Sequence, residues 1–200
     1  MKRILTQCWR LSAAFVLLGI GACSGVVVGM APVADRHANF VPQPGKAMVV
    51  FLRPSTRGFG VQASVFDLRE DFELVGVLAN KKKVAYQAEP GRHLFVVLGE
   101  NTNYLSAHLR SGKTYYVVVE PSAGLVKSRF SLRPISRAET QTDAFRNWLH
   151  ICEWVAKNAD SDKWAAERMD ELREKHFRYL PEWQAIPLDQ RAHLGIDEGV

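Results

Sequence analysis

The sequence predicts a mainly β fold, an antiparallel β-sandwich of about seven or eight strands with a C-terminal two-helix extension. From Lys46 onward, short β-branched and aromatic runs alternate with turn residues at close, regular spacing. Two of these runs, residues 94–98 and 115–119, are apolar on both alternating faces, so we expect something to cover their outer side. Beyond residue 135 the apolar period becomes helical, which predicts the extension.

The strands are expected at residues 47–53, 62–68, 73–79, 84–89, 93–99, 104–109, 114–120 and 125–133. Turn residues separate them. Pro90-Gly91 fits the central pair of a type II turn, because proline fixes φ and glycine accepts a positive φ. Ser111-Gly112 fits a tight hairpin between two strand patterns. These turns fix the strand register locally.

Two amphipathic helices are expected after the strands. Ser136 and Glu139 match a capping box, which predicts that a helix begins there. Its apolar stripe comprises Phe145, Trp148, Leu149, Cys152 and Val155. A second helix is expected from Asp162, capped by Ser161 and ended by Pro181. Its stripe comprises Ala165, Met169, Leu172, His176 and Tyr179. Both stripes should pack on the doubly apolar strands, giving a sheet, sheet and helix layering.

The chain of 200 residues divides into a leader and one domain of ordinary size. Residues 46–135 are expected to form the sandwich, and residues 136–200 a helical extension packed on it. Residues 23–45 contain Pro32, Pro42 and Pro44 among glycines and alanines, so they are interpreted as an anchor and flexible tether. Residues 1–22 are interpreted as a signal peptide.

Cys23 closes the tetrapeptide Ile20-Gly21-Ala22-Cys23 after a short apolar run, and this segment resembles the lipobox of bacterial lipoproteins. The resemblance implies cleavage before Cys23 and attachment of fatty acyl chains, so that the protein is held in a membrane on the periplasmic side. Ser24 next to the anchor resembles a signal for the outer membrane rather than the inner membrane. A second interpretation stays open: residues 11–34 carry no charge and are long enough to remain as an uncleaved transmembrane helix.

Charge and cysteine content limit the function further. The formal net charge is +5, but Lys2, Arg3 and Arg10 lie in the leader, so the exported part is nearly balanced. We therefore expect no nucleic-acid partner. Once Cys8 and Cys23 are assigned to the leader and the anchor, Cys152 is left without a disulfide partner and is interpreted as a buried, inert thiol.

Several segments of the sandwich carry a family resemblance. They are Ser64-Val65-Phe66-Asp67, Val75-Gly76-Val77-Leu78, Ala85-Tyr86, Pro90-Gly91-Arg92-His93-Leu94-Phe95, Leu109-Arg110-Ser111-Gly112-Lys113-Thr114-Tyr115-Tyr116 and Phe130-Ser131-Leu132. They resemble an uncharacterised family of bacterial lipoprotein β-sandwich domains, similar to PEGA-type envelope domains. The matching positions are turns and core residues, so the resemblance implies a fold and assigns no catalytic residue.

Candidate functional residues are few. The six histidines show no metal-ligand spacing, and no nucleophile motif is present, so no cofactor or metal is expected. His93 is interpreted as a hydrogen-bonded core or edge residue, and a pairing with His108 is the alternative. His150 and Cys152 lie two apart on the expected helix and so should face apart, which excludes a joint site there.

Two loops remain as candidate surfaces. Glu100, Asn101, Thr102 and Asn103 form a polar loop between strands, and this loop is the predicted binding surface. The run from Lys81 to Lys83 is interpreted as a solvated turn, with contact to anionic headgroups or acidic glycans as the alternative.

The sequence therefore predicts a lipid-anchored periplasmic protein that acts as a non-enzymatic binding or envelope-assembly module. Its expected partners are the lipid bilayer, through acylated Cys23, and an envelope protein or glycan. The alternative function is an envelope hydrolase or metal-binding protein that uses His93 and His108.

Overall fold

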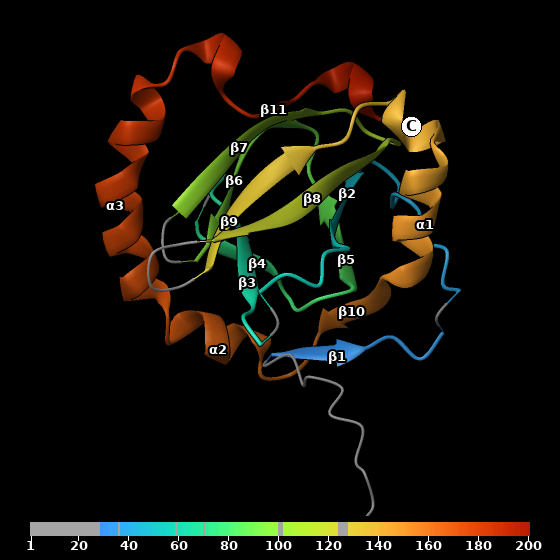
Figure 1. The fold of residues 1–200 in the computed structure, drawn as a ribbon, viewed down its shortest axis with the longest axis horizontal. Helices are drawn as coiled ribbons and strands as arrows, with labels where there is room; N and C mark the ends of the chain where they lie inside the picture. Colours follow the sequence, from blue (N-terminus) through green and yellow to red (C-terminus); the bar gives the residue numbers. More distant parts are fainter. Residues whose placement is uncertain (1–28, 36, 59, 70, 100–101, 124–127) are drawn as a thin grey trace, which may run out of the picture.

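The computed structural model describes residues 29–200, apart from residues 36, 59, 70, 100–101 and 124–127. In the described part of the chain, 11 strands form two mixed sheets, and three α-helices follow near the C-terminus (Figure 1). One sheet has the strand order β1-β10-β5-β2-β8-β9, and the other has the order β11-β7-β6-β3-β4. The prediction of a mainly β sandwich with C-terminal helices is confirmed.

The strands of the described chain have the following bounds: β1 (Met30–Pro32), β2 (Ala47–Arg53), β3 (Ala63–Asp67), β4 (Glu73–Leu78), β5 (Lys82–Ala88), β6 (Gly91–Leu98), β7 (Thr102–Leu109), β8 (Thr114–Ala123), β9 (Ser128–Pro134), β10 (Glu153–Lys157) and β11 (His193–Leu194). The helices are α1 (Asp143–Ile151), α2 (Ser161–Ala166) and α3 (Met169–Ala185), with short 3-10 turns η1 (Glu139–Gln141), η2 (Leu188–Gln190) and η3 (Ile196–Glu198).

The eight predicted strands correspond to β2 to β9, and residues 125–127 of the last one lie outside the described residues. Strands β1, β10 and β11 were not predicted. The sheets are mixed because β2 runs parallel to β8, β5 parallel to β10, and β7 parallel to β11.

Strand β2 lies at the centre of the six-stranded sheet, between β5 and β8, and all seven of its residues are buried. Side chains alternate between the two faces of a strand, and those of Val49 and Phe51 point into the space between the sheets. There the centre of the Phe51 ring lies 5.2 Å from that of Phe95 on the other sheet. Leu52 points to the outer side and joins a separate apolar cluster with α1. The strand is therefore apolar on both faces because both faces are covered.

Helix α1 covers the outer face of the six-stranded sheet. Its Phe145 is buried against Leu52 of β2, Val118 of β8 and Ile135. The helix begins later than predicted: the Phe145 N–H donates to Thr142 Oγ1 at 3.2 Å, so Thr142 is the cap. Ser136 accepts from the Glu139 N–H, as a capping box requires, but this contact opens only the short turn η1.

The first helix also ends earlier than its apolar stripe suggested. It stops at Ile151, and the chain enters β10, where Val155 is a buried strand residue. The prediction of Val155 as a helix position is wrong. The reason is tertiary: residues of β10 pair with the edge of β5, and this ladder replaces the hydrogen bonds of another helical turn.

The second predicted helix is two helices, α2 and α3. Ser161 is not the N-cap residue before the helix, as predicted, but the first residue of α2. It is 1% exposed, and its hydroxyl donates a hydrogen bond to the Gly29 carbonyl. Pro181 does not end α3, which continues to Ala185. Leu180 and Trp183 pack on the core on either side of this proline, and their burial holds the last turn in place.

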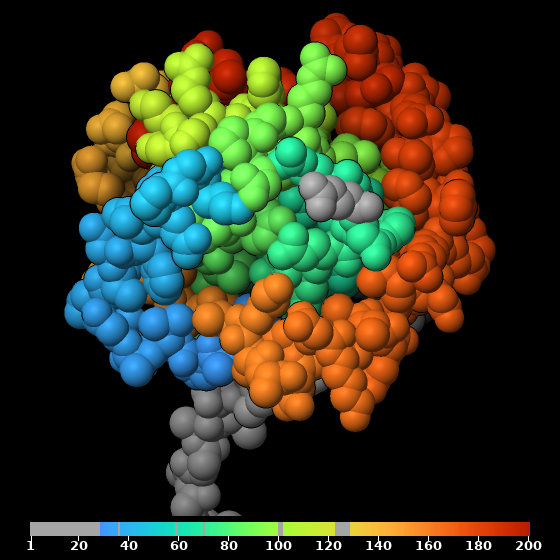
Figure 2. Space-filling model, turned by 180° about the vertical axis from the view of Figure 1, so that it is seen from behind, coloured from blue at the N-terminus to red at the C-terminus, as the bar shows by residue number. Residues whose placement is uncertain are grey.

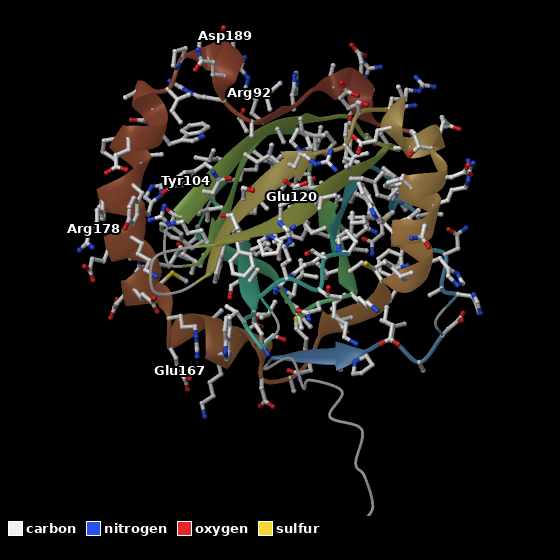
Figure 3. The ribbon with its side chains drawn as sticks, in the orientation of Figure 1. Arg92, Tyr104, Glu120, Glu167, Arg178 and Asp189 are labelled. Carbon is white, nitrogen blue, oxygen red and sulfur yellow. The ribbon has the colours of Figure 1, made fainter. Side chains whose placement is uncertain are left out.

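Helix α3 covers the outer face of the five-stranded sheet. Leu172 is fully buried there, and Tyr104 of β7 packs its ring against His176 and Trp183. In Figure 3, Tyr104 lies between β7 and α3, whereas Arg178 points away from the body. Helices α1 and α3 thus flank the sandwich from opposite sides (Figure 1), so the layering is helix, sheet, sheet, helix rather than the predicted sheet, sheet and helix.

The segment before β2 is not a free tether over its described length. Met30–Pro32 form β1, which pairs antiparallel with β10, and Met30 is 4% exposed. After β1 the segment lies against the body of the molecule (Figure 2, blue). Gln87 fixes its end: the Gln43 N–H donates to Gln87 Oε1, and Gln87 Nε2 donates to the Val41 carbonyl. The tether predicted over residues 23–45 is therefore wrong from Met30 onward, because the prolines do not prevent pairing at a sheet edge.

Arg53, at the end of β2, is fully buried. Its guanidinium donates to the carbonyls of Val61, Leu78, Arg57 and Gly58, at 2.6 to 3.1 Å. The same group lies 4.9 Å from the centre of the Phe130 ring. Burial lowers the pKa of Arg53 to about 10. The residue holds the segment between β2 and β3 onto the end of the sandwich.

None of the helices in the described part of the chain has the length and apolar content that a membrane span needs. The predicted signal peptide and Cys23 lie outside the described residues.

Candidate functional site

A cavity of about 570 Å³ lies on the outer face of the six-stranded sheet. Three parts of the chain enclose it: the outward side chains of β2, β5, β8 and β10, the C-terminal end of α1, and residues 37–40 of the N-terminal segment. The segment can act as a wall because β1 and Gln87 hold it on the body at its two ends. The cavity thus depends on β1 and β10, two of the three strands that were not predicted.

Lys83 is the charged group in the floor of this cavity. It lies in β5 between Leu52 of β2 and Trp154 of β10, and alternation turns it toward α1. Its residue exposure is 5%. Nζ donates to the Leu149 carbonyl near the C-terminal end of α1, and lies 4.5 Å from the centre of the Trp154 ring. Both contacts favour a cation, because the helix end and the ring face are electron-rich.

Neither contact neutralises the charge of Lys83. In the described chain no carboxylate forms an ion pair with Nζ, whereas the neighbouring Lys82 pairs with Glu153 at 2.6 Å. Burial lowers the pKa of Lys83 below that of an exposed lysine. The interpretation of the run from Lys81 to Lys83 as a solvated turn is therefore wrong for Lys83, because the sheet register places it under α1.

The walls of the cavity are aromatic and aliphatic. The Phe40 and Trp154 rings meet edge to face at 4.7 Å, and Tyr116 packs on Phe145 at 4.8 Å. The apolar lining residues are Phe40, Met48, Val50, Tyr116, Leu149, Ile151 and Trp154. His37 and His150 line the same space. The cavity therefore combines an apolar body with one buried cation.

Cys152 also lines the cavity, together with His150. The prediction that these two residues cannot share a site is wrong, because α1 ends at Ile151 and Cys152 no longer follows helical geometry. Cys152 is 2% exposed, and burial raises its pKa to about 12. The thiol is therefore protonated at neutral pH, so the residue is buried as predicted and is a poor nucleophile.

A second hollow, of about 490 Å³, opens beside the inner face of the five-stranded sheet. At its base, His93 Nδ1 lies 2.6 Å from Asp67 Oδ2, and His93 Nε2 lies 2.7 Å from the Glu89 carbonyl. Both ring nitrogens are therefore in hydrogen-bond contact with an oxygen atom. The side chains of His93 and Asp67 are 1% and 3% exposed, so this contact is buried.

Tyr86 completes this cluster. Its hydroxyl lies 3.0 Å from Asp67 Oδ2 and 2.8 Å from Glu73 Oε2, and it can donate its single proton to one of them at a time. Burial, followed by the Asp67 charge, raises the pKa of Tyr86 above its ordinary value. The hollow is lined by four acidic residues, Asp67, Asp71, Glu73 and Glu89, and by the basic residues Lys46 and Arg69.

His93 and His108 do not meet. In the antiparallel ladder His93 lies opposite Ala107, and His108 lies opposite Arg92, so the two imidazoles project from opposite faces of the sheet. His93 is buried and His108 is exposed. The alternative site built from this pair is therefore wrong, whereas the interpretation of His93 as a hydrogen-bonded core residue is confirmed by its two contacts. In the described residues, no group of three metal-ligating side chains converges.

Of the predicted binding loop, Glu100 and Asn101 lie outside the described residues. Thr102 is 6% exposed, and its hydroxyl lies 3.4 Å from Tyr104 Oη. Asn103 Oδ1 accepts from the Leu132 N–H at 3.0 Å, which ties β7 to β9. Thr102 and Asn103 border a shallow hollow of about 320 Å³ next to α3. Their described contacts are structural, and binding by this loop stays a prediction.

The sequence offered only a faint signal for the Lys83 cavity. Its lining comes from segments far apart in the chain, and its central cation belongs to a run of three lysines.

Comparison of the whole chain with protein-family models and with curated proteins finds no match. The resemblance of residues 46–135 to PEGA-type envelope domains therefore stays a prediction.

Proposed function

We propose that this chain is a lipid-anchored periplasmic protein that acts as a non-enzymatic binding module of the cell envelope, and that the Lys83 cavity is its binding site. The observation that carries the proposal is a cavity of about 570 Å³ with an unneutralised, buried lysine in its floor. Ligand pockets in proteins have this size and this mixture of apolar walls with a few polar groups.

Rigidity supports a binding role. The floor is built on β2 and its two neighbours, and β2 is buried throughout. The C-terminal end of α1 forms one wall, and Phe145 of this helix is buried in an apolar cluster that fixes the helix on the sheet. A site on such a scaffold is formed before the ligand arrives, which reduces the entropy lost on binding.

The chemistry of the two hollows favours binding over hydrolysis. Cys152 is a protonated thiol at neutral pH. Both ring nitrogens of His93 are engaged by Asp67 and by the Glu89 carbonyl, so the ring has no free nitrogen with which to accept a proton from a substrate. These features support a module that holds a ligand, an envelope protein or a glycan.

The proposal of lipid anchoring depends on Cys23 and the leader before it. It is tested by metabolic labelling with a fatty acid in a Gram-negative host. The wild type should incorporate label, and Cys23→Ala should lose the label and remain as the longer precursor. Equal size and equal membrane association of the two proteins, with no label in either, would establish the uncleaved helix over residues 11–34 instead.

The binding role is tested with the purified chain and envelope extracts fractionated into glycans, lipids and small molecules. An active fraction should raise the melting temperature of the wild type but not that of Leu149→Trp, because the larger ring fills the cavity. Phe177→Trp is the matched control, since Phe177 is 77% exposed on α3. The proposal is rejected if every active fraction stabilises both variants equally. It is also rejected if the chain hydrolyses peptidoglycan, esters or phosphoesters and loses this turnover, but not its stability, in a His93 variant.

A further inference from the structure

We propose that the Lys83 cavity selects a small organic monoanion, a carboxylate carried on an apolar body, and that the carboxylate pairs with Lys83 Nζ. This inference depends on the proposed binding role of the same cavity and adds the chemical class of the ligand. It follows from charge, shape and the contrast with the second hollow.

The charge argument starts from the ammonium group of Lys83. It carries three N–H donors, and its described hydrogen bond uses one of them, to the Leu149 carbonyl. The centre of the Trp154 ring lies 4.5 Å from the same nitrogen. A buried charge without a counterion costs free energy, and a bound carboxylate would supply both the opposite charge and an acceptor.

The remaining charged and titratable groups around the cavity do not supply that counterion. Glu153 lines the cavity, and its carboxylate forms its ion pair with Lys82. Cys152 stays protonated because burial raises its pKa. His37, His150 and Tyr116 carry no negative charge at neutral pH. The electrostatic character of the cavity is therefore positive.

The walls define the rest of the ligand. Phe40 and Trp154 form an aromatic corner next to the lysine, and Met48, Val50 and Ile151 extend an aliphatic surface from it. Such a surface gains free energy by removing an apolar body from water. With one buried cation in the floor, the cavity matches one negative charge at one end of an otherwise apolar molecule.

The second hollow of the same protein shows the opposite preference and serves as an internal reference. Four carboxylates line it, those of Asp67, Asp71, Glu73 and Glu89, together with the basic residues Lys46 and Arg69. Lys46 pairs with Glu89, and the buried His93 contacts Asp67. The carboxylates outnumber these basic groups, so the hollow disfavours an anion. The Lys83 cavity differs because a carboxylate there would meet a buried cation that has no ion pair in the described part of the chain.

The experiment compares matched acids and alcohols by calorimetry on the purified chain. Octanoate is paired with octanol and phenylacetate with phenylethanol, so that one pair tests an aliphatic body and the other an aromatic body. In at least one pair the acid should bind the wild type about tenfold or more tightly than its alcohol, since a charge-assisted hydrogen bond contributes that much. Lys83→Met should bind both members of the pair equally.

The Lys83→Met variant should fold, because replacing a buried charge by an apolar side chain of similar length is commonly neutral or stabilising. Its melting temperature should equal or exceed that of the wild type. The acid and alcohol comparison on the wild type decides the ligand class by itself, so the proposal remains testable if the variant does not fold. Leu149→Trp should abolish binding of both members.

The outcomes separate the two proposals. If acids and alcohols bind the wild type equally, or if Lys83→Met keeps the preference for the acid, the monoanion class is wrong. If none of the four compounds binds while an envelope fraction still acts through the cavity, the binding role holds and the ligand class is wrong. If neither compounds nor fractions act through the cavity, both proposals are wrong.

Discussion

Removal of the Phe145 ring is expected to detach α1 from the six-stranded sheet. Phe145 is 3% exposed and packs on Leu52, Val118 and Ile135, and its ring meets Tyr116 edge to face at 4.8 Å. This cluster is separate from the main core, so the surrounding residues have few other ways to fill the space. Phe145→Ala should therefore leave most of a ring-sized cavity.

The magnitude follows from the area that the ring buries. A buried phenylalanine removes about 150–250 Å² from water, and at about 25 cal/mol per Å² this corresponds to about 4–6 kcal/mol. Residual compactness of the unfolded chain reduces the figure by about 10–40%, and the lost ring contact with Tyr116 adds about 0.5–1.5 kcal/mol. We expect Phe145→Ala to lower the free energy of unfolding by about 4 kcal/mol, inside the range known for such changes.

Urea denaturation followed by circular dichroism measures this loss. Two variants calibrate it. Trp148→Ala, on the same helix, should cost only about 1–2 kcal/mol, because Trp148 is partly exposed and packs at the edge of the cluster. Phe177→Ala should change stability by about 0.5 kcal/mol or less, since its side chain faces solvent. A cost below about 1 kcal/mol for Phe145→Ala at an unchanged m-value would refute the docking of α1 described above.

Three further predictions concern buried charges and a titrating residue. Arg53→Met should cost about 3–5 kcal/mol, because it removes the hydrogen bonds that four carbonyls accept from the guanidinium. Limited proteolysis should then cut first between β2 and β3, and uniform resistance there would contradict the assignment. Asp67→Asn should cost about 3–5 kcal/mol, because it removes the buried carboxylate that contacts His93 Nδ1. The exposed Asp71→Asn should stay near the wild type, and equal melting temperatures of the two variants would show that the His93 and Asp67 pair is not ionised. Burial lowers the pKa of His176 below 6.5, so the unfolded chain binds the proton first and the stability falls as the pH drops below about 6.5. Between about pH 7.5 and about pH 5.5, the melting temperature of His176→Gln should therefore fall less than that of the wild type. Equal falls in the two proteins would show that His176 is not the cause.

The sequence predicts the eight long strands well because their alternation and turns are local signals. Gly91 and Gly112 both take positive φ, as the predicted turns require. Each turn carries the chain from one sheet to the other, from β5 to β6 and from β7 to β8, so the prediction of a hairpin at Ser111-Gly112 is wrong. Strands β1 and β11 have three and two residues, too few for any periodic pattern. They exist because a sheet edge is available beside them, which is a property of the tertiary structure.

The candidate site was harder to predict than the fold. Lys83 stands in a run of three lysines that was interpreted as a solvated turn, and only Lys81 lies in the turn. Lys82 is the first residue of β5, and its side chain, 15% exposed, pairs with Glu153. Lys83 is buried because the strand register places it opposite Leu52 and Trp154, and because α1 lies over this part of the sheet. A burial that depends on three distant segments leaves no local signature in the sequence.

The pairing of β1 with β10 also limits where the protein can work. If Cys23 is acylated as proposed, only residues 24–29 separate the lipid from Met30, the first residue of β1. Fully extended, six residues span roughly 20 Å, which is less than the diameter of a domain of this size. The body would therefore stay next to the headgroups, with the edge formed by β1 and β10 nearest to the bilayer. A ligand of the Lys83 cavity would have to be met at the membrane surface, where molecules with an apolar body and an acidic head accumulate.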